Sequence, residues 1–330
     1  MKWLRNGGVV CWPYEWQRPN KTEEWAYEFC ANSLRYDPFV QVVCFPWATL
    51  IDARRRNISE KIKLLENALH ELPPRMTMQR VTVMQHIWAA DLSSVLKELG
   101  ITDVFWTHAR IDEYSWLDNI RIHPFPMYPV SSGIENSPSK TKPICERTLT
   151  YSFVGTYVPD LYLTKARLWI YELPVAAESI VIKRSEWHYE GPVYGTHLAG
   201  VEESIEDAKS RNNRAIEFRN TLENSIFSLC PSGSGPNSIR LWESISLGAI
   251  PVVISEKLRL AGDPDEWAKA AIFIGESPSE IRSLPDRLNE IRKCTATISD
   301  MRAAGEKLWR DLFLIDPFFQ KAVGRFGSLT

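Results

Sequence analysis

The stretch NSIFSLCPSGSGPNSIRLWESISLGAIPVVIS, residues 224–255, decides the fold of this chain. Its apolar run 226–230 has the length of a buried strand, and the loop that follows contains Gly233 and Gly235 between two prolines. Glycines permit a close approach of the backbone to a ligand, and Asn237 or Ser238 can then cap a helix. The stretch therefore predicts a strand, a glycine-rich loop and a helix, followed by a second strand.

The predicted helix carries two charged residues on one side. With about 3.6 residues per turn, Arg240 and Glu243 share that side, and Gly248 ends the helix. A helix start after a glycine-rich loop presents N–H groups to an anion, and an arginine there suits phosphate oxygens. A carboxylate one turn further on can accept hydrogen bonds from a ribose. The pattern predicts a nucleoside diphosphate site at the carboxyl edge of the sheet; the alternative is a surface ion pair.

Strand-like and helix-like segments alternate through the rest of the chain. In the first half, runs 8–12, 39–45, 79–85 and 103–107 predict strands, and 22–34, 59–72 and 91–99 predict helices. In the second half, strands are predicted at 151–155, 179–183, 226–230, 249–255 and 271–275, with helices between and after them. Such alternation predicts parallel sheets covered by helices on both faces.

The length predicts two domains, because 330 residues exceed the roughly 250 at which a single core stops growing. Segment 131–148, rich in Ser, Pro, Lys and Thr, is the expected linker. We therefore expect two doubly wound, Rossmann-like α/β domains, at 1–130 and 149–330.

Composition excludes several classes of protein. A formal net charge of -2 gives no overall positive field, so nucleic acid is not an expected partner. The six cysteines lack zinc-site spacing and are expected to be reduced core residues. No apolar run approaches the ~20 residues that cross a bilayer, and the first ten residues are too short and polar for a signal peptide. A cytoplasmic protein, at most peripheral to a membrane, is expected.

Residues 225–253, SIFSLCPSGSGPNSIRLWESISLGAIPVV, closely resemble the C-terminal signature of exostosin-like glycosyltransferases, the family 47 type. YSFVGT at 151–156 looks like the strand and glycine turn that open the donor domain of that family. In the first half, TVMQH at 82–86, DVFWTH at 103–108 and PFPMYPV at 124–130 are similar to bacterial-type members. The resemblance thus touches both halves of the chain.

The resemblance implies a GT-B architecture, in which the first domain binds the acceptor and the second binds a nucleotide sugar across a cleft. It implies an inverting transfer from a nucleoside diphosphate, with UDP as the expected nucleotide, to a glycan acceptor in cell-surface polysaccharide or glycoprotein glycan synthesis. Eukaryotic members carry a membrane anchor and a stem that this sequence lacks, which points to a bacterial or viral cytoplasmic form.

Carried over to this sequence, the resemblance implies that Arg240 meets the pyrophosphate and Glu243 the ribose. The other residues expected at the donor pocket are Gly155, Ser232, Gly233, Gly235, Asn237 and Ser238. Arg167, near the start of a predicted helix, is a further candidate for the diphosphate. No cofactor and no essential metal are expected, since the D-x-D spelling of Asp263 and Asp265 is typical of a helix cap.

An inverting transfer needs one base to deprotonate the acceptor hydroxyl. The candidates follow predicted strands of the first half: His86 after 79–85, and His108, Asp112 and Glu113 after 103–107. A histidine titrates near neutrality, whereas a carboxylate needs desolvation to become a strong base. For each residue the alternative is an ordinary hydrogen-bonded loop position.

Trp12 and Trp16, in WPYEW, are candidate platforms for an acceptor sugar. Two other functions stay open. A sugar-nucleotide epimerase on the same architecture would consume its substrate without an acceptor. A non-catalytic glycan-binding subunit would keep the fold but lose the donor charges, so the presence of Arg240 and Glu243 argues against it.

Overall fold

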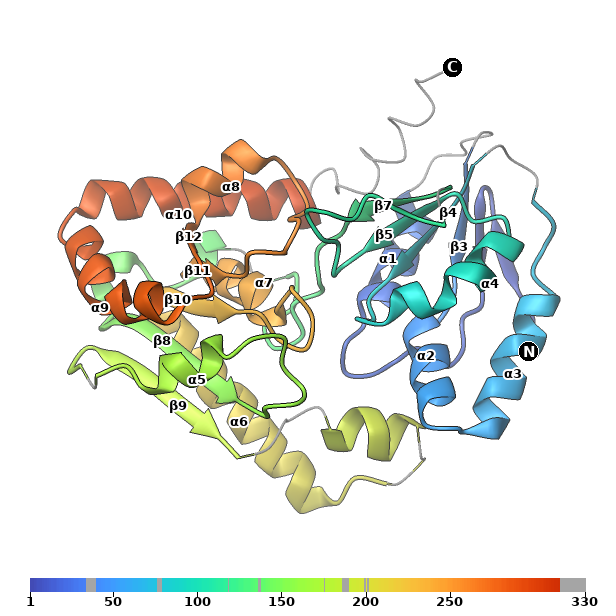
Figure 1. The fold of residues 1–330 in the computed structure, drawn as a ribbon, viewed down its shortest axis with the longest axis horizontal. Coiled ribbons are helices and arrows are strands. Elements are labelled where there is room, and N and C mark those ends of the chain that lie inside the picture. The colour runs from blue at the N-terminus through green and yellow to red at the C-terminus, as the bar shows by residue number, and fades with distance from the viewer. Residues whose placement is uncertain are drawn as a thin grey trace.

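The structure is a computed structural model that describes residues 1–33, 40–75, 79–117, 119–135, 138–174, 176–185, 190–198, 200 and 202–314. Two α/β units lie side by side, each built on its own sheet (Figure 1). Residues 34 and 39, which end one expected helix and begin one expected strand, lie outside the described residues.

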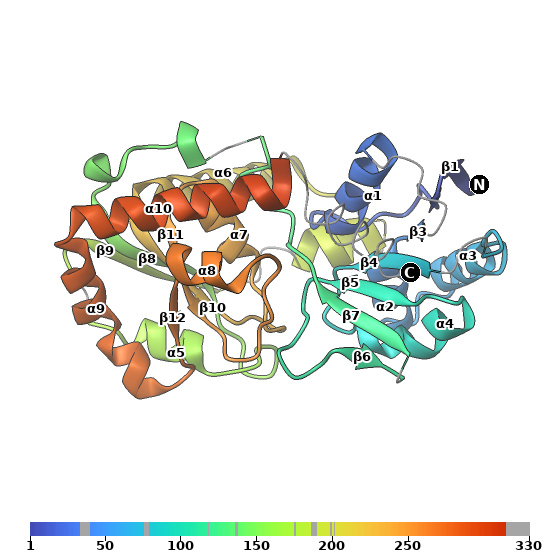
Figure 2. The ribbon, with the colours of Figure 1, turned by 90° about the horizontal axis from the view of Figure 1, so that it is seen from above.

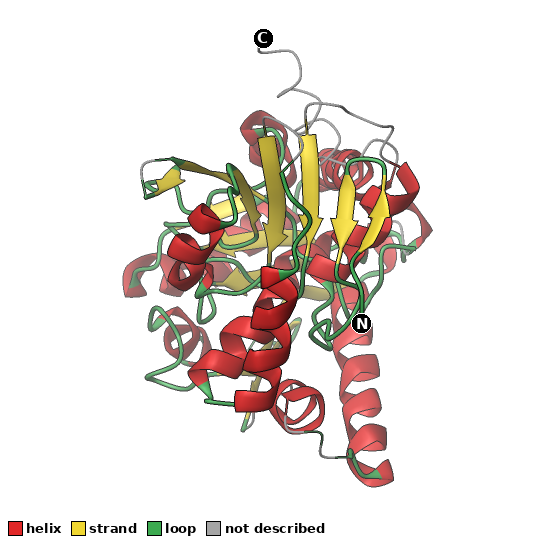
Figure 3. Ribbon diagram, turned by 90° about the vertical axis from the view of Figure 1, so that its right-hand side faces the viewer, coloured by secondary structure: helices red, strands yellow, loops and turns green. Residues whose placement is uncertain are grey.

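The N-terminal sheet, which faces the viewer in Figure 3, has seven strands in the order β1-β2-β3-β4-β5-β7-β6. They are β1 Leu4–Asn6, β2 Val9–Cys11, β3 Val40–Cys44, β4 Gln79–Met84, β5 Asp103–Trp106, β6 Ser115–Trp116 and β7 Ile120–Pro124. β2, β3, β4, β5 and β7 run parallel, whereas β1 and β6 pair antiparallel at the two edges. The four strands predicted in this half are confirmed; the short strands β1, β6 and β7 were not predicted.

Helices cover both faces of this sheet. They are α1 Thr22–Ser33, α2 Trp47–Arg55, α3 Ser59–His70, the 3-10 turn η1 Ala89–Leu92, and α4 Ser93–Glu98. Alternate residues of one strand face opposite sides: Val42 packs in the cluster that holds α1, and Val43 in the cluster that holds α2, α3 and α4. Helix α2 was not predicted. It is buried from Trp47 to Ala53, so its sequence lacks a polar face and a helical period.

The C-terminal sheet has five parallel strands in the order β12-β11-β10-β8-β9. They are β8 Leu149–Thr156, β9 Ser179–Arg184, β10 Ser225–Pro231, β11 Ile250–Ile254 and β12 Ile272–Ile274, and all five were predicted. The helices are α5 Ala166–Tyr171, α6 Ile205–Asn224, α7 Ile239–Ser246, α8 Pro264–Ala270, α9 Pro278–Arg292 and α10 Thr295–Trp309.

The expected linker is packed against the C-terminal unit. It contains the 3-10 turns η2 Pro138–Lys140 and η3 Ile144–Glu146. Arg147 is 4% exposed and donates hydrogen bonds to the carbonyl oxygens of Leu222, Ser225 and Leu247. The polar composition of this segment therefore reflects hydrogen bonding to backbone carbonyls, and not only contact with water.

Two further segments of the C-terminal half reach the N-terminal unit. The π-helical segment η4 Glu190–Leu198, drawn in yellow, lies between α6 and α2, and His197 Nε2 is 3.0 Å from Thr49 Oγ1 (Figure 1). Helix α10 points its C-terminal end towards the N-terminal unit (Figure 2), and the segment η5 Arg310–Leu314 follows it. The centroid of the Phe313 ring lies 5.3 Å from that of Trp25 and 6.0 Å from that of Trp242. These contacts join the two units in one apolar cluster.

The cysteines are free, as predicted, and Cys11, Cys30, Cys44 and Cys230 are buried. Cys145 and Cys294 are exposed, so the prediction that all six lie in the core is wrong for these two, which occupy a turn and a helix start. In the described part of the chain, no helix combines the length and the apolar character that spanning a bilayer requires.

Candidate functional site

The glycine-rich loop lies where the strand order of the C-terminal sheet reverses. β8 and β10 are neighbours there, and the chain turns outward to β9 on one side and to β11 on the other. Open α/β sheets bind ligands at such a switch point, beyond the carboxyl ends of the strands. Loop 232–238 follows β10 at this point and leads into α7, so the predicted strand, loop and helix are confirmed.

The two ends of α7 agree with the sequence. Ser238 is the N-cap residue, but its side chain makes no capping hydrogen bond. Instead Asn237 Oδ1 accepts the N–H of Ser238 at 2.9 Å. Gly248 follows the helix with φ of 69°, a conformation that favours glycine, so the predicted helix stop is confirmed.

Arg240 lies buried beneath the end of β8. It is 7% exposed, its Nη2 donates to the carbonyl oxygen of Val154, and its guanidinium lies 4.4 Å from the centroid of the Phe153 ring. Nε and Nη1 have no hydrogen-bond partner among the described residues. Because Arg240 and Glu243 are both buried, the alternative of a surface ion pair is wrong.

Arg167, at the start of α5, lies beside Arg240. It is 8% exposed, Nε donates to the carbonyl oxygen of Ser232 at 3.0 Å, and Nη1 donates to that of Thr156 at 3.2 Å. Its guanidinium also packs 4.3 Å from the centroid of the Tyr162 ring. Burial and the neighbouring Arg240 lower the pKa of Arg167 to about 10. The sequence thus identified both arginines of this site.

Gly155 gives the two guanidinium groups room to meet. A Cβ atom at this position would lie 3.0 Å from Arg240 Nη2 and 3.3 Å from Arg167 Nη1. Neither arginine forms an ion pair with a carboxylate in the described part of the chain. Two buried cations side by side repel each other, and burial lowers the pKa of Arg240 as well. The arrangement is suited to a ligand with more than one negative charge.

Glu243 faces the segment that joins the two units. It is 2% exposed, and Oε1 accepts the backbone N–H of Ser131 at 2.8 Å. Burial raises the pKa of Glu243, and the hydrogen bonds from Ser131 lower it. The sequence did not reveal this contact, because the partners are 112 residues apart. A ribose at Glu243, which stays a prediction, would share the carboxylate with Ser131.

Ser232 and Gly233 join the loop to its neighbours. Ser232 Oγ donates to Glu276 Oε1, which also accepts from Thr164 Oγ1 at 3.0 Å. The N–H of Gly233 donates to the carbonyl oxygen of Gly235 at 2.9 Å, and its own carbonyl accepts from Leu163. Sequence reasoning missed Glu276 and Thr164; the position of Glu276 directly after the predicted strand 271–275 was the available signal.

Asn237 connects the loop to the N-terminal unit. Its Nδ2 donates to the carbonyl oxygen of Thr107 at 2.6 Å, and its Oδ1 accepts from Trp242 Nε1 at 3.0 Å as well as from Ser238. The residue is 4% exposed. Asn237 was expected to line the donor pocket, which stays a prediction; the structure shows that it holds the two units together.

His108 contacts the glycine-rich loop from the opposite unit. A Cβ atom on Gly235 would lie 2.5 Å from His108 Nδ1 and 2.7 Å from Ile87 Cγ2, so only glycine fits. His108 is 4% exposed, and Nδ1 has no hydrogen-bond partner among the described residues. Burial, and to a lesser extent the charge of His86, lower the pKa of His108 to about 3.

The other base candidates lie in different surroundings. Both ring nitrogens of His86 are used: Nε2 lies 3.1 Å from Asp52 Oδ1, and Nδ1 accepts the N–H of Trp88 at 3.1 Å. The side chain of Asp112 is 70% exposed and 3.9 Å from Arg110. Glu113 Oε1 accepts from Trp116 Nε1 at 2.6 Å. Among the four candidates, the structure brings His108 to the loop.

Trp12 and Trp16 are buried, with 3% and 9% of their surface exposed. Trp12 packs against Trp3 and Tyr14, and Trp16 stacks on Tyr27. The expectation that they offer open faces to an acceptor sugar is wrong, because their rings serve as core.

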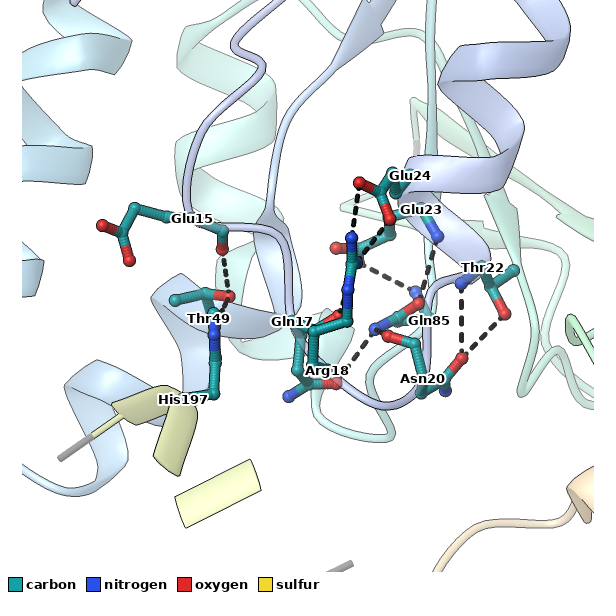
Figure 4. A network of polar contacts seen from close by, with 10 residues as sticks. All are labelled: Glu15, Gln17, Arg18, Asn20, Thr22, Glu23, Glu24, Thr49, Gln85 and His197. Carbon is teal, nitrogen blue, oxygen red and sulfur yellow. Dashed lines mark hydrogen bonds and ion pairs between the residues drawn. The ribbon is translucent and has the colours of Figure 1, made fainter. Parts of the chain in front are cut away.

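A polar network fixes the loops that follow β2, β3 and β4 (Figure 4). Glu23 accepts the N–H of Gln85 at 3.0 Å and that of Ala48 at 3.2 Å, and burial raises its pKa to about 8. Gln85 Nε2 donates to Gln17 Oε1 at 2.9 Å, and Gln17 Nε2 donates to Asp52 at 2.5 Å. These groups satisfy one another, so the network serves to position the carboxyl edge of the N-terminal sheet.

Asp263 caps α8 through the N–H of Asp265 at 2.9 Å, as its spacing predicted. Within the ranges that the structure describes, no group of three or more His, Cys, Asp or Glu side chains is arranged to hold a metal ion.

Two Rossmann-like units, with a basic site at the switch point of the second, define the GT-B class of fold. The sequence profile of the Exostosin GT47 domain matches residues 81–290. The chain therefore belongs to the exostosin GT47 family, which confirms the resemblance seen in residues 225–253.

Curated relatives match shorter segments. A probable glucuronosyltransferase of Oryza sativa subsp. japonica is 44% identical over 114 residues, which cover 34% of this chain and 24% of that protein. Exostosin-1 of Drosophila melanogaster is 30% identical over 99 residues, which cover 28% of this chain and 13% of that protein. The chain thus spans about a quarter or less of the length of these relatives. Among solved structures, Anabaena HepE in complex with UDP aligns over 88% of this chain and 79% of that one, with 10% identity and a TM-score of 0.41.

Proposed function

We propose that the protein transfers a sugar from a nucleoside diphosphate, with UDP as the expected nucleotide, to a hydroxyl of a glycan acceptor. The observation that carries this proposal is the pair of buried guanidinium groups, Arg167 and Arg240, which meet at Gly155 without a carboxylate partner in the described part of the chain. Membership of the exostosin GT47 family supports the same reaction class.

The physical argument concerns the cost of buried charge. Moving an unpaired ion from water into a protein interior costs roughly several kcal/mol of free energy. A folded chain therefore rarely keeps two such cations together. A diphosphate would supply the missing negative charge and accept hydrogen bonds from Nε and Nη1 of Arg240. The same contacts would stabilise the diphosphate as it leaves the sugar.

Inversion and independence of a metal are parts of the proposal. The two arginines would supply the positive charge that a divalent cation supplies in other phosphate sites. Transfer should then persist in the presence of EDTA. The acceptor is proposed to be a glycan, and a uronosyl, hexosyl or pentosyl donor fits equally; the rice relative is named a glucuronosyltransferase.

The test is calorimetry with UDP on the wild type, Arg167→Met and Arg240→Met. Arg211→Met is the matched control, because Arg211 on α6 is 42% exposed and pairs with Glu203, which precedes the helix. We expect binding by the wild type and the control, and weak binding by the two site variants. Equal binding by all four proteins would refute the site.

Product analysis then separates the enzyme classes. The protein is incubated with UDP-glucose, UDP-galactose, UDP-xylose, UDP-glucuronic acid or UDP-N-acetylglucosamine, with and without an oligosaccharide panel. A transferase elongates an oligosaccharide and leaves the donor almost intact without one. Conversion of the donor sugar without an acceptor would identify an epimerase, and glycan binding without UDP binding would identify a non-catalytic subunit.

A further inference from the structure

We propose that His108 hydrogen-bonds a hydroxyl of the donor sugar through Nδ1. This inference rests on the proposed function, since it names what the second half of the donor site recognises. It changes the role that the sequence suggested for this residue.

The placement of His108 is built into the contact between the two units. Asn237 holds the carbonyl oxygen of Thr107 at 2.6 Å, and Thr107 directly precedes His108. The loop residue nearest the imidazole is Gly235, whose missing side chain leaves the space that the ring fills. The backbones of Ala109 and Ile111 bond to those of Arg259 and Lys257 at 2.9 and 3.1 Å, which fixes the same segment from its other side.

The Nδ1 atom of His108 indicates a ligand site, because it is buried and has no hydrogen-bond partner. Buried polar atoms in folded proteins are nearly always hydrogen-bonded. In the described part of the chain, the buried polar atoms without a partner include this atom, which faces Gly235 of the glycine-rich loop, and two nitrogens of Arg240 on α7. They come from opposite units, so one ligand between the units would satisfy both.

The order of groups in a nucleotide sugar assigns the two sides. Gly233 lies next to Arg167, since a Cβ atom added to this glycine would be 3.6 Å from Nη2, and Gly235 lies next to His108. A diphosphate at the arginines therefore has its sugar on the side of the loop that faces the N-terminal unit. His108 stands at that side.

The chemistry of the ring suits a hydroxyl. Its low pKa, about 3, keeps the imidazole neutral at any pH at which the protein would work. A neutral imidazole has one N–H and one lone pair, and a sugar hydroxyl both donates and accepts. A ring that resists protonation so strongly is a poor proton acceptor, which argues against the role of base.

Two amide variants locate the atom that matters. The side-chain amide of Asn reaches the position of Nδ1, whereas that of Gln reaches the position of Nε2. We compare His108→Asn, His108→Gln and His108→Ala, with His70→Gln on the exposed end of α3 as the control. Calorimetry measures the affinity for UDP and for the UDP-sugar that the wild type binds most tightly among the five named above.

We expect all variants to bind UDP as the wild type does. His108→Asn should keep the added affinity for the UDP-sugar within about three-fold, whereas His108→Gln and His108→Ala should lose about ten-fold, the value of one hydrogen bond. In turnover with an acceptor, His108→Asn should keep measurable activity and the pH profile of the wild type. A general base at this position would give the opposite result, because an amide cannot accept the proton.

Three results would overturn the inference. They are an inactive His108→Asn that still binds the UDP-sugar, equal losses for the Asn and Gln variants, and a loss of affinity for UDP itself. A wild type that does not bind UDP would instead refute the proposed function. If a variant fails to fold, deoxy-sugar donors give the same answer with the wild type: one analogue should lose about ten-fold in affinity, and uniform affinity across the analogues would refute the contact.

Discussion

Replacing Gly235 with alanine tests how closely the two units approach each other. The new Cβ would lie 2.5 Å from His108 Nδ1, 2.7 Å from Ile87 Cγ2 and 2.8 Å from His108 Cε1. Since apolar atoms rest about 3.5 to 4.0 Å apart, the imidazole must move by about 1 Å. It cannot do so freely, because its segment is held by Asn237 and by the backbone hydrogen bond between Ala109 and Arg259.

Overpacking of this kind costs about 1 to 3 kcal/mol. The loss of chain freedom in the unfolded state returns only about 0.4 to 1 kcal/mol. Gly235→Ala should therefore lower the free energy of unfolding by about 1.3 kcal/mol, the difference between the middle values of these two effects. The displaced imidazole should also weaken binding of the UDP-sugar by about ten-fold, the value of one hydrogen bond.

Gly233→Ala is the matched control for stability. It lies in the same loop, but its nearest neighbour would be Arg167 Nη2 at 3.6 Å, an ordinary contact. Urea titration of the two variants measures the difference. Gly233→Ala should equal or exceed the wild type in stability. Two variants of equal stability would show that His108 does not press on Gly235, and the geometry argued for the donor site would be wrong.

Other changes test the charges and the contact between the units. Arg240→Met should weaken UDP binding by about 10 to 100-fold, the value of a charged hydrogen bond, yet leave the unliganded protein at least as stable because a buried unpaired charge is gone; calorimetry and thermal melting check both, and a less stable apo variant would contradict the argument. Asn237→Ala should cost about 2 kcal/mol in urea titration, since Thr107 and Trp242 lose their buried partner, and unchanged stability would show that this bridge is dispensable. The pKa of His108 is about 3 in the folded protein against an ordinary 6.5. As the pH drops, the unfolded chain therefore takes up this proton before the folded protein does. The free energy of unfolding should fall between pH 6.5 and pH 3, by up to about 1.4 kcal/mol per pH unit. The variant His108→Asn should lose this pH dependence. The pKa of Glu23 is raised from 4.5 to about 8, so its effect has the opposite sign: stability should fall as pH rises through this range, and Glu23→Gln should remove that slope in melts at pH 5 and pH 8.

The predicted strands were read correctly because central parallel strands are covered on both faces. β3 and β10 are buried at every position and mostly apolar, so each can be recognised without knowing which strands it pairs with. The missed strand β6 lacks that signature, because it has only two residues, of which Ser115 is exposed. The prediction missed helix α2, because this helix is buried on nearly every side and so lacks the polar face from which a helix is recognised.

The site was predictable where its residues are neighbours in sequence. The loop, α7 and Gly248 follow from local turn and helix chemistry, and Arg240 was placed on the side of the helix that meets Gly155. Contacts across more than 100 residues were not predictable: Ser131 at Glu243 and Thr107 at Asn237 depend on how the two units dock. Trp12 and Trp16 are core residues because they pack on Trp3, Tyr14 and Tyr27 of the N-terminal unit itself, contacts that the sequence did not reveal.

The return of segment η5 to the N-terminal unit has a consequence for any attempt to divide the protein. Trp25 is 5% exposed, and part of its cover is Phe313, from beyond the last helix. A fragment that stops after the first sheet would leave that indole facing water, and it would be prone to aggregate. Conversely, a single protease cut in the joining segment would leave the halves associated through η5 and His197. Co-expressed halves, divided near residue 140, should therefore reassemble.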